Sequence, residues 1–367
     1  MSTCIYDITA SWADNVARGP QFDSPVPQRP QTHSDQWIDF LGYKVASRIG
    51  VPAGPLLDSR WISLAASLGY DIVTYKTIRT AASTGHAPPN VLYLQADGKQ
   101  LPAAGDTTPL QAAGVEQPDE AAATAVAITN SFGMPSMDAA FLMADIPAAQ
   151  AALRPGQLLV VSVTGTPNRP NGVGFAEDFV QAALLAKQAG AKVIEANLSC
   201  PNVGKGQGAL YADAQQVAAL TAALVQALGP AVPLLLKVGA FPDKAALEAV
   251  LGAAAAAGAR GVAGINGLSR SIITADGEPA LGPDRPTSGV CGAPIRHAAL
   301  QFVRAARRII DRRQLGLALV GVGGVMCAQH AVDMLEAGAD VVQSATGMMW
   351  HPLLAHEYHQ LVQQQSR

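Results

Sequence analysis

Three stretches of residues 192–239 decide the fold: KVIEANLS (192–199), DAQQVAALTAALVQAL (213–228) and VPLLLKVG (232–239). The first and third are short apolar runs of the kind that form buried strands. The second repeats apolar residues at helical spacing and is followed by Gly229, a common helix end. A strand, a helix and a second strand in this order predict a βαβ unit with parallel strands.

The same alternation of strand and helix runs from residue 41 to the end of the chain. Nearly continuous apolar strands indicate burial on both faces of a parallel sheet, and about eight repeats predict a (β/α)8 TIM barrel over residues 41–367. The alternative is an open doubly wound sheet, but no G-x-G-x-x-G follows the first strand. Nine stretches are candidates for the eight strand positions, so at least one is misassigned or lies outside the barrel. The candidates are 49–54, 71–77, 126–130, 158–163, 192–199, 232–239, 261–267, 317–323 and 340–346.

Three further segments surround this pattern. Residues 1–40 form a polar, proline-containing N-terminal arm that is expected to extend over the barrel. Residues 91–102 predict a hairpin around Asp97-Gly98, and residues 271–289 contain a second turn signal at Asp276-Gly277. Insertions that follow barrel strands lie at the C-terminal face, where active sites form, so both are candidate covers for a substrate.

Composition excludes several classes of function. With 14% charged residues, a net charge of −3 and a pI near 6.2, the chain has no basic surface for nucleic acid. No apolar run approaches the ~20 residues of a membrane span, and the first residues lack the order of a signal peptide. The four cysteines include no C-x-x-C pair, so neither a disulfide framework nor a metal site is expected. A cytoplasmic protein with a small-molecule ligand is the expectation.

Amides and amines follow the predicted strands. Lys76, Asn130, Asn197, Lys237 and Asn266 each come at or just after a strand, where side chains of a barrel converge on one pocket. No carboxylate or histidine occupies these positions, which argues against a glycosidase or a zinc hydrolase. Neutral amides with two ammonium groups suit a planar, amide-rich ligand and a redox cofactor. A buried lysine requires an anionic ligand or an ion pair, and the residues leave both open.

Glycines mark a candidate phosphate site. LVGVGGV (319–325) and QSATG (343–347) end the last two predicted strands. Loops in this position of a barrel commonly bind phosphate through backbone N–H groups, and glycine allows the close approach.

Cys200 lies in NLSCPNV (197–203), between Asn197 and Asn202. A free cysteine is most often a small buried apolar residue. Here, however, it begins an irregular, glycine-rich segment, where a thiolate could act as a general base. Local features alone leave both interpretations open.

Together these motifs resemble the dihydroorotate dehydrogenase family of FMN-dependent barrel enzymes. The resemblance covers residues 41–350, and NLSCPN is its most specific element. In order along the chain, the matching stretches are DFLGYKVASRIGVPAG, YKT, TNSFGMPS, NLSCPNV, LLLKVG, GING, SGVCGAPIRHAAL, GVGGV and QSATG.

The resemblance implies that Cys200 removes a proton from C5 of dihydroorotate while C6 passes hydride to flavin N5. A cysteine base is typical of the class 1 enzymes, so a cytoplasmic homodimer is expected, with fumarate or an NAD-linked partner subunit as electron acceptor. The implied FMN-binding residues are Ala53, Gly54, Lys76, Thr77, Asn197, Lys237, Gly289, Gly292, Gly323, Gly324, Ala345 and Thr346. The implied substrate-binding residues are Lys76, Asn130, Phe132, Gly133, Met134, Asn197, Asn202 and Asn266.

Two positions depart from the family pattern. Gly267 follows Asn266 where the family usually has serine or threonine, and Ser136 stands where class 1 members commonly have asparagine. These departures leave two alternatives open: an oxidoreductase for a dihydropyrimidine or another cyclic amide, and a flavin-binding barrel without catalysis.

Overall fold

The computed structural model describes residues 4–29, 32–96, 98–115, 120–167, 172–199 and 210–365. Eight parallel strands close into a barrel, which confirms the predicted fold and excludes the open sheet. Each strand pairs with the next one named, and the last pairs with the first. They are β3 (Ile49–Val51), β4 (Ile72–Ile78), β8 (Leu158–Val163), β9 (Val193–Asn197), β10 (Leu234–Lys237), β11 (Gly261–Gly264), β14 (Ala318–Val322) and β15 (Val341–Gln343).

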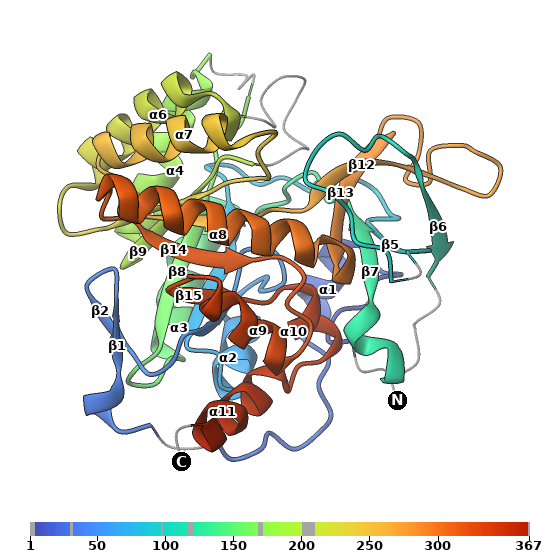
Figure 1. The fold of residues 1–367 in the computed structure, drawn as a ribbon, viewed down its shortest axis with the longest axis horizontal. Helices are drawn as coiled ribbons and strands as arrows, with labels where there is room; N and C mark the ends of the chain where they lie inside the picture. The colour runs from blue at the N-terminus through green and yellow to red at the C-terminus, as the bar shows by residue number, and fades with distance from the viewer. Residues whose placement is uncertain are drawn as a thin grey trace.

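Helices pack around the barrel (Figure 1). The side chains of Asp58, Asp138, Asp213 and Asp243 accept hydrogen bonds at helix N-termini, which explains where α2, α3, α6 and α7 begin. Among the described residues, no helix is both long and apolar enough to cross a bilayer. The helices of the barrel are α2 (Ser59–Ser67), α3 (Ala139–Ala151), α4 (Phe175–Gln188), α6 (Ala214–Leu228), α7 (Lys244–Ala256), α8 (Arg296–Arg313), α9 (Ala328–Glu336), α10 (Thr346–Trp350) and α11 (Leu354–Gln365). Short 3₁₀ turns are η1 (Ser34–Gln36), η2 (Glu120–Ala125), η3 (Leu210–Ala212) and η4 (Ala293–Ile295).

The ninth predicted strand lies outside the barrel, in a second sheet beside it (Figure 1). This strand, residues 126–130 in the prediction, is as apolar as the barrel strands, so only its pairing distinguishes it. It pairs antiparallel with one strand from each of the two insertions that follow β4 and β11. The members of this sheet are β5 (Val91–Leu94), β6 (Leu110–Gly114), β7 (Ala127–Asn130), β12 (Leu268–Ile273) and β13 (Thr287–Gly292).

The predicted turn at Asp276-Gly277 is confirmed, whereas the predicted hairpin within 91–102 is wrong. At Asp276-Gly277 the chain reverses between β12 and β13, with the Gly277 amide donating to the Thr274 carbonyl at 3.1 Å. The hairpin within 91–102 does not form, because β5 pairs with β6 and β7 instead. Asp97 itself lies outside the described residues. The stretch directly after Gly98 supplies no strand in the described structure, whereas β6 and β7 pair with the two edges of β5.

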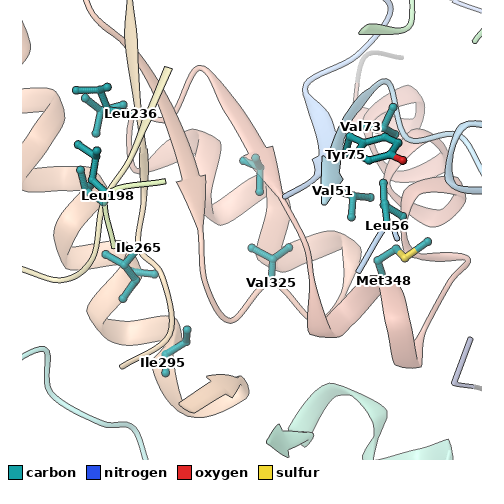
Figure 2. Close-up of a cluster of buried hydrophobic side chains, with 14 of the residues drawn as sticks. Val51, Leu56, Val73, Tyr75, Leu198, Leu236, Ile265, Ile295, Val325 and Met348 are labelled. Atoms are coloured by element: carbon teal, nitrogen blue, oxygen red, sulfur yellow. The ribbon is translucent and has the colours of Figure 1, made fainter. Parts of the chain in front are cut away.

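An apolar cluster fills the part of the barrel interior next to the hairpin of β1 (Ile38–Phe40) and β2 (Tyr43–Val45). It contains residues of most barrel strands together with Phe40 and Val45 from this hairpin. This hairpin therefore closes the amino-terminal end of the barrel. A second cluster lies outside the strands, where Val73 and Tyr75 of β4 lie near Leu56 and Met348 (Figure 2). With one end closed and the outside covered, the open end is where a ligand can enter.

The N-terminal arm is partly built into the core. The Ile5 amide donates to the Met349 carbonyl at 3.0 Å, and the ring of Tyr6 contacts those of Trp61 and Phe132 with centroids 6.0 and 5.9 Å apart. Helix α1 (Trp12–Arg18) follows, with Trp12 only 7% exposed. The apolar residues within CIYDITASW (4–12) explain this burial. The expectation of a polar arm over the barrel therefore misses a buried segment.

Candidate active site

A cavity at the carboxyl ends of the barrel strands gathers most of the predicted site residues. Its empty space, with the open mouth included, is about 1400 Å³. Gly133 is not among its lining residues and packs against the His86 ring. Cys200 and Asn202 lie outside the described residues. The predicted residues that line the cavity are Ala53, Gly54, Lys76, Thr77, Asn130, Phe132, Met134, Asn197, Lys237, Asn266, Gly289, Gly292, Gly323, Gly324, Ala345 and Thr346.

Strand pairing fixes the position of Asn197. This residue ends β9 and pairs with Lys237 of β10, so the two side chains lie at the same height at the carboxyl ends of the strands. The Asn197 amide donates to the Thr77 hydroxyl at 3.3 Å, and its carbonyl oxygen accepts from the Ser199 backbone at the same distance. Thr77 is in turn 3.0 Å from the Ser162 hydroxyl. The amide of Asn197 is therefore held at both ends before any ligand binds.

The other two amides are also held. Asn266 donates to the carbonyl and the hydroxyl oxygen of Ser199 at 2.9 and 3.0 Å, and its own carbonyl accepts from the Gly267 amide at 2.9 Å. Asn130, at the end of β7, donates to the Cys291 thiol at 3.4 Å. Two amides from the barrel and one from the second sheet thus face a single cavity.

The cavity is positively charged. Lys76 and Lys237 are only 8% and 4% exposed, and both line it. Of the lining residues in the described part of the chain, none is an aspartate or a glutamate. A cavity with two ammonium groups and no carboxylate favours an anionic ligand.

Glu195 lies below this surface and was not predicted. It precedes Asn197 by two residues on β9, so it points to the same face of the strand, into the barrel. It is fully buried. Burial raises the pKa of its carboxyl group, and Lys237 and a hydrogen bond with the Ser162 side chain oppose that rise. Glu195 and Lys237 form no salt bridge among the described residues, although their charges interact electrostatically.

Glycines form the other end of the cavity. Gly324 has φ +68°, and a Cβ built there would lie 2.5 and 2.6 Å from the Cα and backbone nitrogen of Arg296. A Cβ at Gly292 would collide with the carbonyl oxygen of Val126. Only glycine fits these two positions without a shift. The glycines therefore let the chain pack closely at this end of the cavity, where barrel enzymes commonly bind phosphate.

Several lining residues were missed. Tyr6 and Trp12 come from the N-terminal segment, and Gln343 and Met349 follow β14 in the chain. The apolar content of residues 4–12 was the sequence feature that could have indicated burial of Tyr6 and Trp12. Gln343 resembles Glu195, since it is a polar residue inside an apolar strand, and its side-chain oxygen is buried without a partner in the described structure.

Comparison with known proteins supports the same interpretation. The family model described as "Dihydroorotate dehydrogenase" matches residues 38–363. The chain is 43% identical over 361 residues to the dihydroorotate dehydrogenase of Dictyostelium discoideum, covering 97% of this chain and 96% of that protein. The chain belongs to the dihydroorotate dehydrogenase family.

More distant dihydroorotate dehydrogenases agree. The enzyme A (fumarate) of Limosilactobacillus reuteri strain DSM 20016 is 33% identical over 187 residues, or 50% of this chain and 57% of that protein. The crystal structure of the Eimeria tenella enzyme with ferulenol has the same fold, with a TM-score of 0.70 at 16% identity over 96% of this chain and 89% of that one. Other relatives are named for quinone or NAD(+).

Dihydroorotate dehydrogenases use FMN, and the cavity fits this cofactor. The glycines near Gly324 would bind its phosphate, and Lys237 would lie against the ring. The absence of acidic groups among the described lining residues suits the phosphate charge. The residues present therefore match the cofactor that the family requires.

The two departures from the family pattern have structural explanations. Ser136 is 4% exposed, and its hydroxyl accepts from the Arg79 amide and donates to the Met137 carbonyl. It therefore stabilises the turn beside the cavity and does not line it. Gly267 lines the cavity and packs against Cys291.

Proposed function

We propose that the protein oxidises (S)-dihydroorotate to orotate with bound FMN. The observation that carries the proposal is the convergence of Asn130, Asn197 and Asn266 with Lys76 on one cavity whose described lining contains no acid. Dihydroorotate presents an imide edge and a carboxylate. Amides can pair with the imide without adding charge, and the Lys76 ammonium group complements the carboxylate.

When bound, FMN supplies the acceptor for the hydride that leaves C6 of the substrate. The side chains of this chain do the rest. Lys237 places a positive charge where negative charge collects during the reaction. The amides of Asn197 and Asn266 keep the substrate ring in one plane, because their own bonds to Thr77 and Ser199 prevent them from turning.

Cys200 is the proposed general base at C5. It lies outside the described residues, and its role comes from the family resemblance. Ser199, the residue before it, accepts two hydrogen bonds from Asn266, which anchors the described chain immediately before the cysteine. A serine in place of Cys200 has a far weaker tendency to take the proton at neutral pH.

Anaerobic flavin reduction tests the proposal. Adding dihydroorotate to the FMN-loaded protein should bleach the flavin absorbance, and Cys200→Ser should slow that step by about 10²- to 10⁴-fold. Cys327→Ala is the matched control, because Cys327 does not line the cavity. Dihydrouracil lacks the carboxylate that Lys76 would bind, so it should not bleach the flavin at the same concentration. Bleaching by dihydrouracil alone would contradict the choice of substrate.

We infer a cytoplasmic homodimer from the resemblance to class 1 enzymes and from the cysteine base. Fumarate is the electron acceptor that this resemblance favours for a chain working without a partner subunit. Light scattering on the purified protein should give twice the chain mass. Turnover with fumarate should exceed turnover with NAD⁺, and the reverse order would indicate a partner subunit.

A further inference from the structure

Cys291 occupies a wall of the cavity that the mechanism above leaves unused. It lies on β13, which pairs antiparallel with β7 so that Gly289 faces Asn130 and Cys291 faces Ile128. Side chains alternate along paired strands, so these four residues share one face, and all four line the cavity. The thiol is therefore diagonal to Asn130 on the same surface.

The thiol is the described hydrogen-bond partner of the Asn130 side chain. The amide nitrogen lies 3.4 Å from Sγ, within the range for a bond to sulfur. Burial raises the pKa of Cys291 to about 11, so the group stays a neutral thiol at physiological pH. It can orient the amide without adding charge to a cavity built for an anion.

Gly267 completes the arrangement. A Cβ at this position would lie 3.0 Å from Sγ of Cys291, 3.1 Å from the Val290 carbonyl oxygen and 3.3 Å from Cα of Gly289. Each distance is tighter than an ordinary van der Waals contact. A side chain at 267 and a thiol at 291 therefore compete for the same space.

We propose that Cys291 is a positioning residue for the substrate, which holds the Asn130 amide in its binding orientation and requires glycine at position 267. The inference rests on the proposed function, because it assigns Asn130 to the substrate. It explains why a hydroxyl-bearing residue is absent after Asn266, since the space is taken by sulfur from the second sheet.

Orotate binding and steady-state kinetics on the FMN-loaded protein test this role. Cys291→Ala should raise the orotate dissociation constant and the KM for dihydroorotate by about 3- to 10-fold, the loss of one modest hydrogen bond. The kcat and the FMN affinity should change less than twofold (about the precision of such assays). Cys291→Ser keeps an acceptor and should restore most of the affinity, and Cys327→Ala should match the wild type. If the alanine variant fails to fold, Cys291→Val removes the acceptor at similar volume.

A double-mutant cycle tests the competition for space. Gly267→Ala should weaken orotate binding more in the wild-type background than in the Cys291→Ala background, because the contact with sulfur is then gone while those with the Val290 and Gly289 backbone remain. Wild-type orotate affinity in Cys291→Ala, or additive losses in the double mutant, would overturn the inference. If the flavin of the wild-type protein is not bleached by dihydroorotate and the protein does not bind orotate, the proposed function itself is wrong. Failure of the proposed function is thus distinguished from failure of the role of Cys291.

Discussion

Replacing Gly324 with alanine should weaken both the fold and FMN binding. Gly324 has φ +68°, where an alanine costs roughly 1–2 kcal/mol. Its Cβ would also lie within 2.6 Å of the Arg296 backbone nitrogen, at the start of α8, and such overpacking costs about 1–3 kcal/mol. The free energy of unfolding should therefore fall by about 2–5 kcal/mol in total.

Gly316 provides the matched control. It has φ +66°, but no atom lies within 4 Å of a Cβ built there, and it precedes β14 at the opposite end of the barrel. Gly316→Ala should cost only the backbone term of roughly 1–2 kcal/mol. The difference between the two variants isolates the clash at the glycine loop.

Denaturant unfolding of the FMN-free protein and a fluorescence titration with FMN measure the two effects. If the loop moves to relieve a clash of about 1–3 kcal/mol, the FMN dissociation constant of Gly324→Ala should rise about 5- to 150-fold. The Gly316→Ala constant should stay at the wild-type value. Equal FMN affinity in the two variants would refute the assignment of this loop to the phosphate.

Three further predictions concern the barrel and its polar layer. Burial raises the pKa of Glu195 above its ordinary value of 4.5, so the folded state holds a proton that the unfolded state has lost at pH values just above 4.5. The free energy of unfolding of the FMN-free protein should therefore be lower at pH 8 than at pH 5, and that of Glu195→Gln should not show this loss. The same pH dependence in the wild type and in Glu195→Gln, measured by denaturant unfolding, would contradict this. Trp12→Ala should lower the free energy of unfolding by about 3–5 kcal/mol, and a loss below about 1 kcal/mol would show that the N-terminal segment is not part of the core. Asp145→Ala should lower the free energy of unfolding by about 1–3 kcal/mol, because the buried Tyr75 hydroxyl, which donates to Asp145 at 2.6 Å, then loses its acceptor. Adding Tyr75→Phe to this variant should recover part of the loss, and additive losses in the double mutant would argue against the pairing.

The barrel could be predicted because each of its strands carries a short apolar run followed by an amide, an amine or glycines. Residues 126–130 show the limit of that signal. Their apolar pattern equals that of a barrel strand, and only pairing with β5 and β13 removes them from the barrel. Pairing between distant segments leaves no local mark in the sequence.

The candidate site divides in a similar way. Asn197 and Lys237 were predictable because the carboxyl ends of parallel strands meet at one edge. Glu195 was not identified, although its spacing of two residues from Asn197 places both on one face of β9. Trp12 lines the cavity although it lies in the N-terminal segment, far along the chain from the barrel strands that form most of the site. Its position therefore depends on tertiary packing, which local sequence patterns do not show.

Anaerobic reduction of the bound flavin by dihydroorotate distinguishes an oxidising enzyme from a flavin-binding barrel without catalysis. Dihydroorotate should bleach the flavin fully, at a rate that Cys200→Ser lowers by about 10²- to 10⁴-fold with FMN still bound. A protein that binds FMN and stays yellow under excess dihydroorotate would contradict it.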